Sequence, residues 1–262
     1  LGAVKLYFAA SHPHRSTSAM ILDSARAISP KIPPLPAPKL IIFDWDGTLV
    51  QSTGHIVRCF EQAISRMGLP ALPALEIQGI IGLGLLEACQ SLFPHLSLEE
   101  AESLANAYRT IYFTRDEVLE PYEGARELLQ NLQAEGCWLA IATGKSNRGL
   151  NEALAETGFG AYFLSTRTAE QTASKPSPMM LLQLLDEFGL KPEQAWVVGD
   201  TDFDLHMAHN AGCWPIAITH GAHSPSRLMS ANPAHVIDDL HSLLPLYREA
   251  MSVDLNLRES QP

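Results

Sequence analysis

The sequence predicts an α/β fold: a Rossmann-like, three-layer parallel sheet with a small α-helical cap domain inserted after the first strand. Short apolar runs alternate with amphipathic helical patterns along most of the chain, which is typical of a parallel sheet covered on both faces. Between residues 52 and 120 the patterns are helical and no run reads as a strand, and this segment is too long for a connecting loop. Acidic and hydroxyl side chains follow several of the apolar runs, at the strand ends where such sheets bind ligands.

Charge and cysteine usage narrow the class of protein. Among 262 residues, 18 are Lys or Arg and 29 are Asp or Glu, and the resulting net charge of -11 disfavours nucleic acid and anionic membranes as partners. No apolar run is long enough to span a membrane. The cysteines form no C-x-x-C pair, so we expect reduced, mostly buried thiols and a cytoplasmic protein. They are Cys59, Cys89, Cys137 and Cys213.

The chain divides into four parts by composition and periodicity. Residues 1–38 are rich in Ser and Pro, show no sustained periodicity and are expected to form a partly ordered N-terminal extension. Their excess of Ser and Arg over acidic residues also suggests a targeting peptide, but no secretory apolar region or cleavage site is evident. The remaining parts are an α/β core (39–51 and 121–248), a helical cap (52–120) and a C-terminal tail (249–262).

The core is expected to contain four buried strands with helices between them. The strands are Leu40–Phe43, Trp138–Ala142, Ala195–Val198 and Pro215–Ile218. Apolar residues at helical spacing predict one helix from Ala125 to Leu132 and another from Leu181 to Phe188. Ser177 is the expected N-cap of the second helix, with Pro178 in its first position.

The cap is expected to contain two longer amphipathic helices. One runs from Ile56 to Met67 and ends before Gly68. The other begins after Ser97, where S-L-E-E predicts a capping box, and continues to Ile111. Between them, Gly79–Gly84 lacks the preceding strand and third glycine of a dinucleotide-binding loop, so it reads as a turn that either faces the substrate or only breaks a helix.

The first strand runs directly into two carboxylates, Asp44 and Asp46, in the stretch IIFDWDGTLV. A solvated turn would also tolerate an Asp-x-Asp pair, so the role of this pair has to be inferred from the residues at the ends of the other strands. Thr143 follows the second strand, and its hydroxyl together with the amides of the next helix could hold an anion. The stretch ATGKS is not a P-loop, because Leu139 stands where that motif needs glycine.

Two further segments place charge at the same edge. Lys175 precedes a helix, and Asp200, Asp202 and Asp204 follow the third strand. Taken alone, Lys175 would be interpreted as a solvated surface charge. Carboxylates crowded into one cleft would repel each other unless a divalent cation neutralised them, and hard oxygen ligands favour Mg2+ over zinc.

Taken in order, these residues resemble the four motifs of the haloacid dehalogenase superfamily of phosphohydrolases. The matching residues are Asp44-Trp45-Asp46-Gly47-Thr48, Thr143, Lys175, and Gly199-Asp200-Thr201 with Asp204. The match covers residues 39 to about 240. The helical insertion resembles the cap of the subgroup that contains phosphoglycolate phosphatase and beta-phosphoglucomutase.

The resemblance implies a role for each of these residues. Asp44 would attack phosphorus and form an aspartyl phosphate. Asp46 would protonate the leaving oxygen and then accept a proton from water. Mg2+ would be bound by Asp44, the carbonyl of Asp46, and Asp200, with Asp204 acting through water. Phosphoryl oxygens would be bound by Thr143 and the amides of Gly144 and Trp45, and Lys175 would neutralise the nucleophile and the transferring group.

The expected activity is therefore Mg2+-dependent hydrolysis of a small phosphorylated metabolite. Asp46 favours a phosphatase or phosphomutase over a haloalkanoic acid dehalogenase, which lacks that acid, and over P-type ATPases, which have Thr there. A sugar-phosphate mutase and a non-catalytic phosphometabolite sensor remain the alternatives, and the oligomeric state is left open. Gln51 departs from the Asp found in many relatives at this point of the cap hinge.

Other polar residues have weaker functional signals. His206 and His209, and again His220 and His223, lie one helical turn apart, but surface or core histidines are expected because the carboxylates already explain a metal. In the cap, His55, Arg58 and Arg66 are candidates for contacting the leaving group, although solvated helix charges explain them equally simply.

Overall fold

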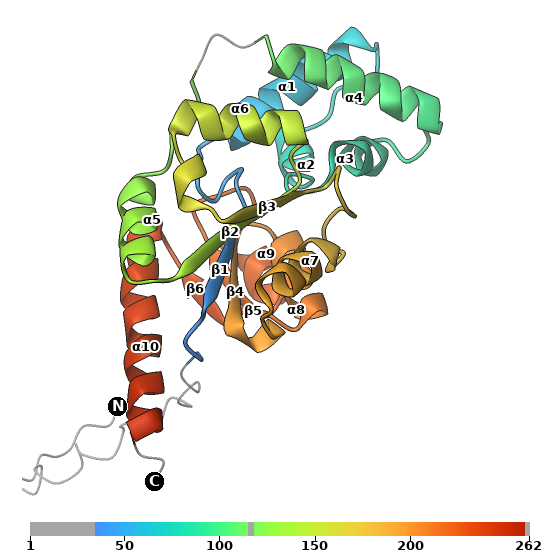
Figure 1. Ribbon diagram of the computed structural model, residues 1–262. Helices are drawn as coiled ribbons and strands as arrows, with labels where there is room; N and C mark the ends of the chain where they lie inside the picture. The colour runs from blue at the N-terminus through green and yellow to red at the C-terminus, as the bar shows by residue number, and fades with distance from the viewer. Residues whose placement is uncertain (1–34, 115–117, 260–262) are drawn as a thin grey trace, which may run out of the picture. The chain divides into compact units, whose positions relative to one another are not determined.

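The computed structural model describes residues 35–114 and 118–259 of the chain (Figure 1). The expected N-terminal extension therefore lies almost entirely outside the described residues.

The six strands found in the described residues form one parallel sheet in the order β3-β2-β1-β4-β5-β6. They are β1 (Leu40–Phe43), β2 (Trp138–Thr143), β3 (Ser165–Thr168), β4 (Ala195–Gly199), β5 (Trp214–Ile218) and β6 (His235–Ile237). The four predicted strands are confirmed, each to within one residue at either end. The two unpredicted strands lie at the sheet edges: β3 is polar and mostly half-buried, and β6 has only three residues.

Helices cover both faces of the sheet, as the alternating pattern predicts (Figure 1). One face, including Ile42 and Val197, packs with residues of α7 and α8. The other face, including Ile41 and Val198, packs with α5 and α10. The core helices are α5 (Ala125–Ala134), α6 (Asn147–Thr157), α7 (Met179–Phe188), α8 (Asp202–Ala211), α9 (Pro225–Ser230) and α10 (Leu243–Glu259).

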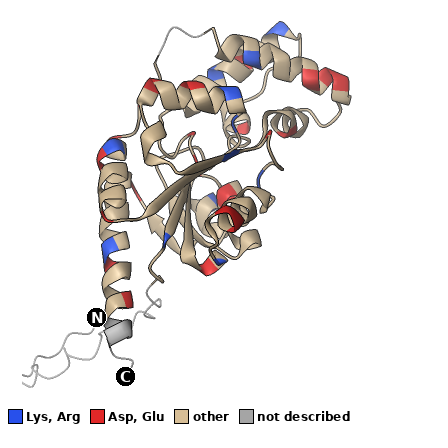
Figure 2. Cartoon of the chain, in the orientation of Figure 1, with Lys and Arg blue, Asp and Glu red and all other residues tan. Residues whose placement is uncertain are grey.

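Four helices and no strand are described between β1 and α5: α1 (Thr53–Arg66), α2 (Ala74–Gln78), α3 (Leu85–Leu92) and α4 (Leu98–Tyr112). The capping box at Ser97 is confirmed, because the Ser97 Oγ accepts from the Glu100 amide while the Glu100 carboxylate accepts from the Ser97 amide. Figure 2 shows acidic residues at this end of α4, where the helix dipole favours negative charge.

The insertion joins the core through two adjacent chain segments. Val50 and Pro121 form a β-bridge, the Gln51 amide donates to the Glu120 carbonyl, and the Tyr122 amide donates to the Leu49 carbonyl. The Gln51 side chain also donates to the Pro121 carbonyl at 3.2 Å. Gln51 therefore stabilises this neck, formed by residues 49–51 and 120–122, with neutral hydrogen bonds.

Two boundaries differ from those expected. Pro178, not Ser177, is the N-cap of α7, because the first helical hydrogen bond runs from the Leu182 amide to the Pro178 carbonyl. The expected boundary at residue 248 falls inside α10, in which Tyr247 and Ala250 are buried. The other domain boundaries stay predictions.

The four cysteines, all of which lie in the described residues, form no disulfide and are buried, as expected. Within the described ranges, no helix is both long enough and apolar enough to cross a membrane.

Candidate functional site

The residues that the sequence singled out gather at the carboxyl ends of three adjacent strands. Asp44 follows β1, Thr143 ends β2, and Asp200 follows β4. Phe43 pairs with Ile141 on one side and with Val198 on the other, and the Asp44 amide donates to the Val198 carbonyl at 2.9 Å. The strand order reverses direction around β1, a position where open parallel sheets bind ligands.

Three buried carboxylates lie together at this edge. Asp44, Asp200 and Asp204 each offer one oxygen, and these oxygens lie within 4.8 Å of one another. Burial raises the pKa of Asp44 to about 7, a shift that Lys175 opposes and Asp204 increases. Burial and the neighbouring carboxylates of Asp44 and Asp204 raise the pKa of Asp200 well above its usual range. The arrangement disfavours full ionisation unless a cation is bound.

Lys175 lies between two of these carboxylates. Its Nζ is 2.7 Å from Asp44 Oδ1 and 2.6 Å from Asp204 Oδ1, and all three side chains are buried. Burial alone would lower the pKa of Lys175, but the charges of Asp204 and Asp44 outweigh it and raise the pKa. The other oxygen of Asp204 accepts from the Thr201 hydroxyl at 2.6 Å. Asp44 Oδ2, by contrast, is buried without a hydrogen-bond partner among the described residues.

The Asp200 carboxylate is held tightly from two sides. It accepts from the Thr48 hydroxyl at 2.7 Å and from the Ala222 amide at 2.6 Å. A Cβ at either Gly47 or Gly221 would overlap its Oδ2. Gly47 also has a φ of +82°, so both space and backbone conformation require glycine there.

The Asp46 side chain does not belong to this group of three carboxylates, and it contacts residues that the sequence did not connect to it. It accepts from the Ser52 hydroxyl at 2.6 Å, and both its oxygens are paired with Lys145 Nζ, at 2.9 and 3.0 Å. The sequence analysis weighed Lys145 only as part of a rejected P-loop. Its position two residues after the end of β2, at the edge where the carboxylates were expected, was the signal that could have identified it.

A cavity of about 680 Å³, including its open mouth, lies between this edge and the insertion. The core contributes Asp44, Asp46, Thr143, Gly144 and Lys145 to its wall. The indole of Trp45 instead packs in the core against Phe159, so only its amide remains a candidate ligand.

The insertion contributes a mostly apolar wall. Part of the Gly79–Gly84 turn lines the cavity, in agreement with the reading that it faces the substrate. Of the three polar cap candidates, Arg58 and Arg66 are exposed and His55 is buried against Tyr112. None of the three lines the cavity. The insertion residues in the wall are Ile56, Phe60, Ile80, Ile81, Gly82, Leu83, Leu85, Ala88, Tyr108, Arg109, Tyr112 and Phe113.

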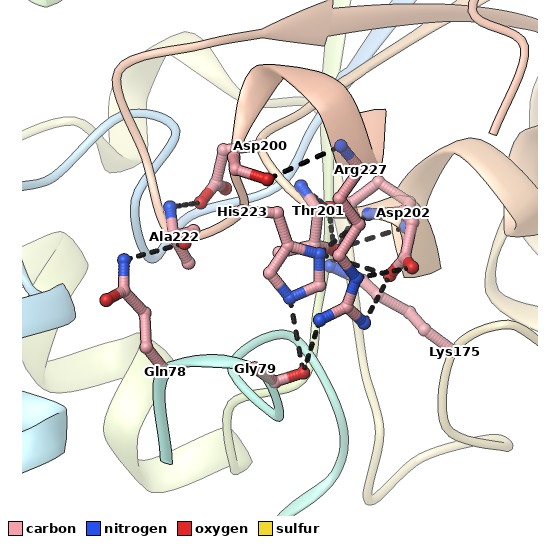
Figure 3. A network of polar contacts seen from close by, with 11 residues as sticks. Gln78, Gly79, Lys175, Asp200, Thr201, Asp202, Ala222, His223 and Arg227 are labelled. Atoms are coloured by element: carbon pink, nitrogen blue, oxygen red, sulfur yellow. Dashed lines mark hydrogen bonds and ion pairs between the residues drawn. The ribbon is translucent and has the colours of Figure 1, made fainter. Parts of the chain in front are cut away.

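The Gly79 end of this turn is tied to the core beside Asp200 (Figure 3). The Gly79 carbonyl accepts from His223 Nε2 and from Arg227 Nη1, each at 3.2 Å. His223 Nδ1 accepts from the Asp202 amide, and the Arg227 guanidinium binds both oxygens of Asp202 at 2.7 and 2.9 Å. Gln78 adds a 2.6 Å hydrogen bond to the Ala222 carbonyl. His223 therefore connects two parts of the chain.

Two other histidines have ordinary polar contacts. His220 Nε2 lies 3.1 Å from the Thr48 carbonyl, and its ring stacks on Tyr122. His209 Nε2 lies within hydrogen-bonding distance of the Ala231 and Asn232 carbonyls. In the part of the chain that the structure describes, the carboxylate group is the one cluster suited to a metal ion.

Comparisons with known proteins point to one family. Residues 41–218 match the family model of the haloacid dehalogenase-like hydrolases. A phosphoglycolate phosphatase of Pseudomonas syringae pv. tomato is 30% identical over 217 residues, which are 79% of each chain. One from Vibrio cholerae is 29% identical over 215 residues, 79% of this chain and 95% of its own.

A solved structure shares the fold. The crystal structure of a predicted phosphoglycolate phosphatase from Haemophilus somnus 129PT aligns with a TM-score of 0.73 and 26% identity, covering 81% of this chain and 99% of the other. The motifs, the fold and these similarities agree, and the chain belongs to the haloacid dehalogenase-like hydrolase family, among its phosphoglycolate phosphatase-like members.

Proposed function

We propose that this chain, a phosphoric monoester hydrolase, cleaves a small phosphorylated metabolite with Mg2+ through an aspartyl-phosphate intermediate on Asp44. The observation that carries the proposal is the environment of the Asp44 carboxylate. Its Oδ2 has no hydrogen-bond partner among the described residues, while Oδ1 pairs with Lys175, and the residue lines the cavity. A carboxylate oxygen that is positioned and not hydrogen-bonded is suited to nucleophilic attack.

The residues present fit a divalent cation. Asp44, Asp200 and Asp204 supply hard oxygen atoms in one small volume, and burial raises the pKa of two of them. We propose that Asp44 and Asp200, with the Asp46 carbonyl, would bind Mg2+, and that Asp204 acts through water. When bound, the ion would offset the negative charge of the phosphoryl group and of these carboxylates.

We assign the other residues at this edge roles that their positions support. Lys175 lies against Asp44 and would neutralise charge at the attacked phosphorus. Thr143 and Gly144 line the cavity beside Asp44, and with the Trp45 amide they would bind phosphoryl oxygens. Attack by Asp44 would divide hydrolysis into two displacements. Asp46 would donate a proton to the leaving oxygen in the first and accept one from the attacking water in the second.

The cavity restricts the leaving group. Its apolar insertion wall carries only a few polar side chains, including Tyr108 and Arg109. We propose a small phosphomonoester, such as phosphoglycolate or a sugar phosphate, as the substrate that binds in this cavity. The names of the relatives support phosphoglycolate as the first compound to test.

The test is inorganic phosphate release from phosphoglycolate, sugar phosphates, nucleotides and pyrophosphate, with Mg2+ or with EDTA. We expect Mg2+-dependent release of phosphate, absent from the Asp44→Asn variant. Release that continues in EDTA or in this variant would contradict the proposal. Transfer of phosphate to a sugar hydroxyl without release would instead identify the sugar-phosphate mutase alternative.

A further inference from the structure

Lys145 connects the Asp46 carboxylate to the helical insertion. Its Nζ lies 2.9 and 3.0 Å from the two oxygens of Asp46 and 2.9 Å from the Tyr112 hydroxyl. An ammonium group has three N–H donors, and three contacts use them all. The Lys145 side chain is only 7% exposed, so water competes weakly for these contacts.

Tyr112 fixes the far end of this connection. It is the last residue of α4, it is buried, and its ring packs against His55, Tyr108 and Phe113 of the insertion. The Lys145 ammonium also lies 4.9 Å from the centre of the Tyr112 ring, a favourable cation–π distance. The position of the Lys145 head group therefore depends on where α4 lies.

The opposite end of the insertion contacts the same carboxylate. Ser52 is the N-cap of α1, and its hydroxyl donates to Asp46 Oδ1 at 2.6 Å. Asp46 is thus bound by the residue at which the insertion begins and, through Lys145, by the end of its last helix. Neither Lys145 nor Ser52 contacts Asp44 through any described ion pair or hydrogen bond.

We propose that Lys145 is a positioning residue that couples the placement of the insertion to the orientation of Asp46. The inference rests on the proposed role of Asp46 in proton transfer. When the insertion is seated, Ser52 and Lys145 hold Asp46 from two directions. When α4 moves away, Lys145 loses Tyr112, and the Asp46 carboxylate loses one of its two fixed contacts. Because all three Lys145 donors are engaged, direct binding of a substrate anion would require it to release a partner.

The kinetic test compares leaving groups in the Lys145→Met variant, which keeps an unbranched apolar side chain without the charge. Proton donation matters for an alkyl phosphate and little for an aryl phosphate with an acidic phenol. Because the second displacement is common to both substrates, the comparison uses kcat/KM, which reports the first displacement. We expect kcat/KM for the alkyl substrate to fall about tenfold or more, up to the about 10²–10⁴-fold contribution of general acid–base catalysis, and kcat/KM for the aryl substrate to change much less. Tyr112→Phe should show a smaller effect with the same leaving-group pattern.

A double-mutant cycle separates positioning from direct substrate binding. If Lys145 acts through Asp46, Lys145→Met has little further effect on kcat/KM for the alkyl substrate in an Asp46→Asn background. Equal losses of kcat/KM for both leaving groups, or losses of kcat/KM that add in the double variant, would overturn the proposal. A rise in KM confined to substrates with a second anionic group would show direct substrate binding and would also overturn it. Lys191→Met, at an exposed lysine outside the cavity wall, is the matched control.

A measurement without substrate keeps this inference separable from the proposed function. Amide hydrogen exchange should be faster in α4 of Lys145→Met than in wild type, with α7 unchanged as the internal reference. Unchanged exchange in α4 would contradict the coupling even if the enzyme is active. Absence of phosphate release by wild type, with faster α4 exchange in the variant, would refute the proposed function and leave the connection itself intact.

Discussion

Gly144→Ala tests how closely the insertion packs on the strand end where the phosphoryl group is proposed to bind. A Cβ at Gly144 would lie 2.6 Å from the Gly82 carbonyl oxygen and closer still to that of Leu83. Ordinary contact begins at 3.4 Å, so the turn would have to retreat by about 0.8 Å or more. Gly144 does not have a positive φ, so the effect comes from this contact and not from backbone strain.

The opposing atoms are backbone carbonyls, which cannot rotate away as a flexible side chain can. Overpacking of this kind typically destabilises a protein by about 1–3 kcal/mol. For a chain of this size, each kcal/mol corresponds to a fall in Tm of about 2–4 °C. If the turn moves instead, the cavity opens and KM rises. Both effects are expected, in proportions that depend on how firmly Gly79 is held by His223 and Arg227.

The assay is urea unfolding combined with steady-state kinetics of phosphate release. Gly160→Ala is the matched control, because Gly160 is exposed and its added Cβ would meet only Leu154, at 4.0 Å. We expect the control to retain wild-type stability and KM. If Gly144→Ala matches the control in both measurements, the turn does not press on Gly144 and the reasoning is wrong.

Three further predictions concern the carboxylates and the contact at Gly79. Asp44→Asn should abolish phosphate release, because it removes the nucleophile. The variant should keep a wild-type circular dichroism spectrum, because the side-chain volume is unchanged and Lys175 keeps its second carboxylate partner, Asp204. Sustained turnover would refute the assignment of Asp44 as the nucleophile. Because the folded pKa of Asp44 is raised to about 7 and that of Asp200 is raised as well, the stability these groups contribute is present below about pH 4 and is lost as pH rises toward 7. In EDTA, the Tm of wild type should therefore fall between about pH 4 and pH 7 by more than the Tm of Asp44→Asn falls. Mg2+ should raise the Tm of wild type more at pH 8 than at pH 5. Equal dependence of Tm on pH in wild type and Asp44→Asn would contradict this prediction. Arg227→Ala should lower the free energy of unfolding by about 1 kcal/mol, since its ion pair with Asp202 is partly exposed, and it should also raise KM. Arg148→Ala, which removes a more exposed ion pair, should lower the free energy of unfolding by less. Identical unfolding curves for the two variants would count against the connection between Gly79 and the core.

The strand ends explain why the grouping of most of the candidate site residues could be predicted from the sequence. Asp44, Thr143 and Asp200 each follow a strand recognisable from its apolar run, and parallel strands bring such positions to one edge. Lys175 precedes a helix rather than following a strand, and its place came from the family resemblance. The structure puts it within 2.7 Å of Asp44.

The contacts that were missed depend on tertiary packing. Lys145 and Asp46 are 99 positions apart, and Lys145 and Tyr112 are 33 apart, so no local pattern connects them. Strand β3 was missed because its Ser-Thr-Arg-Thr sequence has no apolar alternation. Its Arg167 pairs with Glu187 of α7, a contact that becomes visible only once the helix is packed on the sheet.

The neck formed by Val50 and Pro121 gives the insertion a modular character. Paired residues on adjacent antiparallel segments lie about 4.5–5.5 Å apart, so the chain leaves the core and returns to it at nearly the same point. Helices of another length, or a short turn, could therefore join the same two ends without changing the order of the strands or the positions of Asp44 and Asp200. One hydrolytic centre could in this way acquire a new substrate-facing wall by exchange of a single continuous segment.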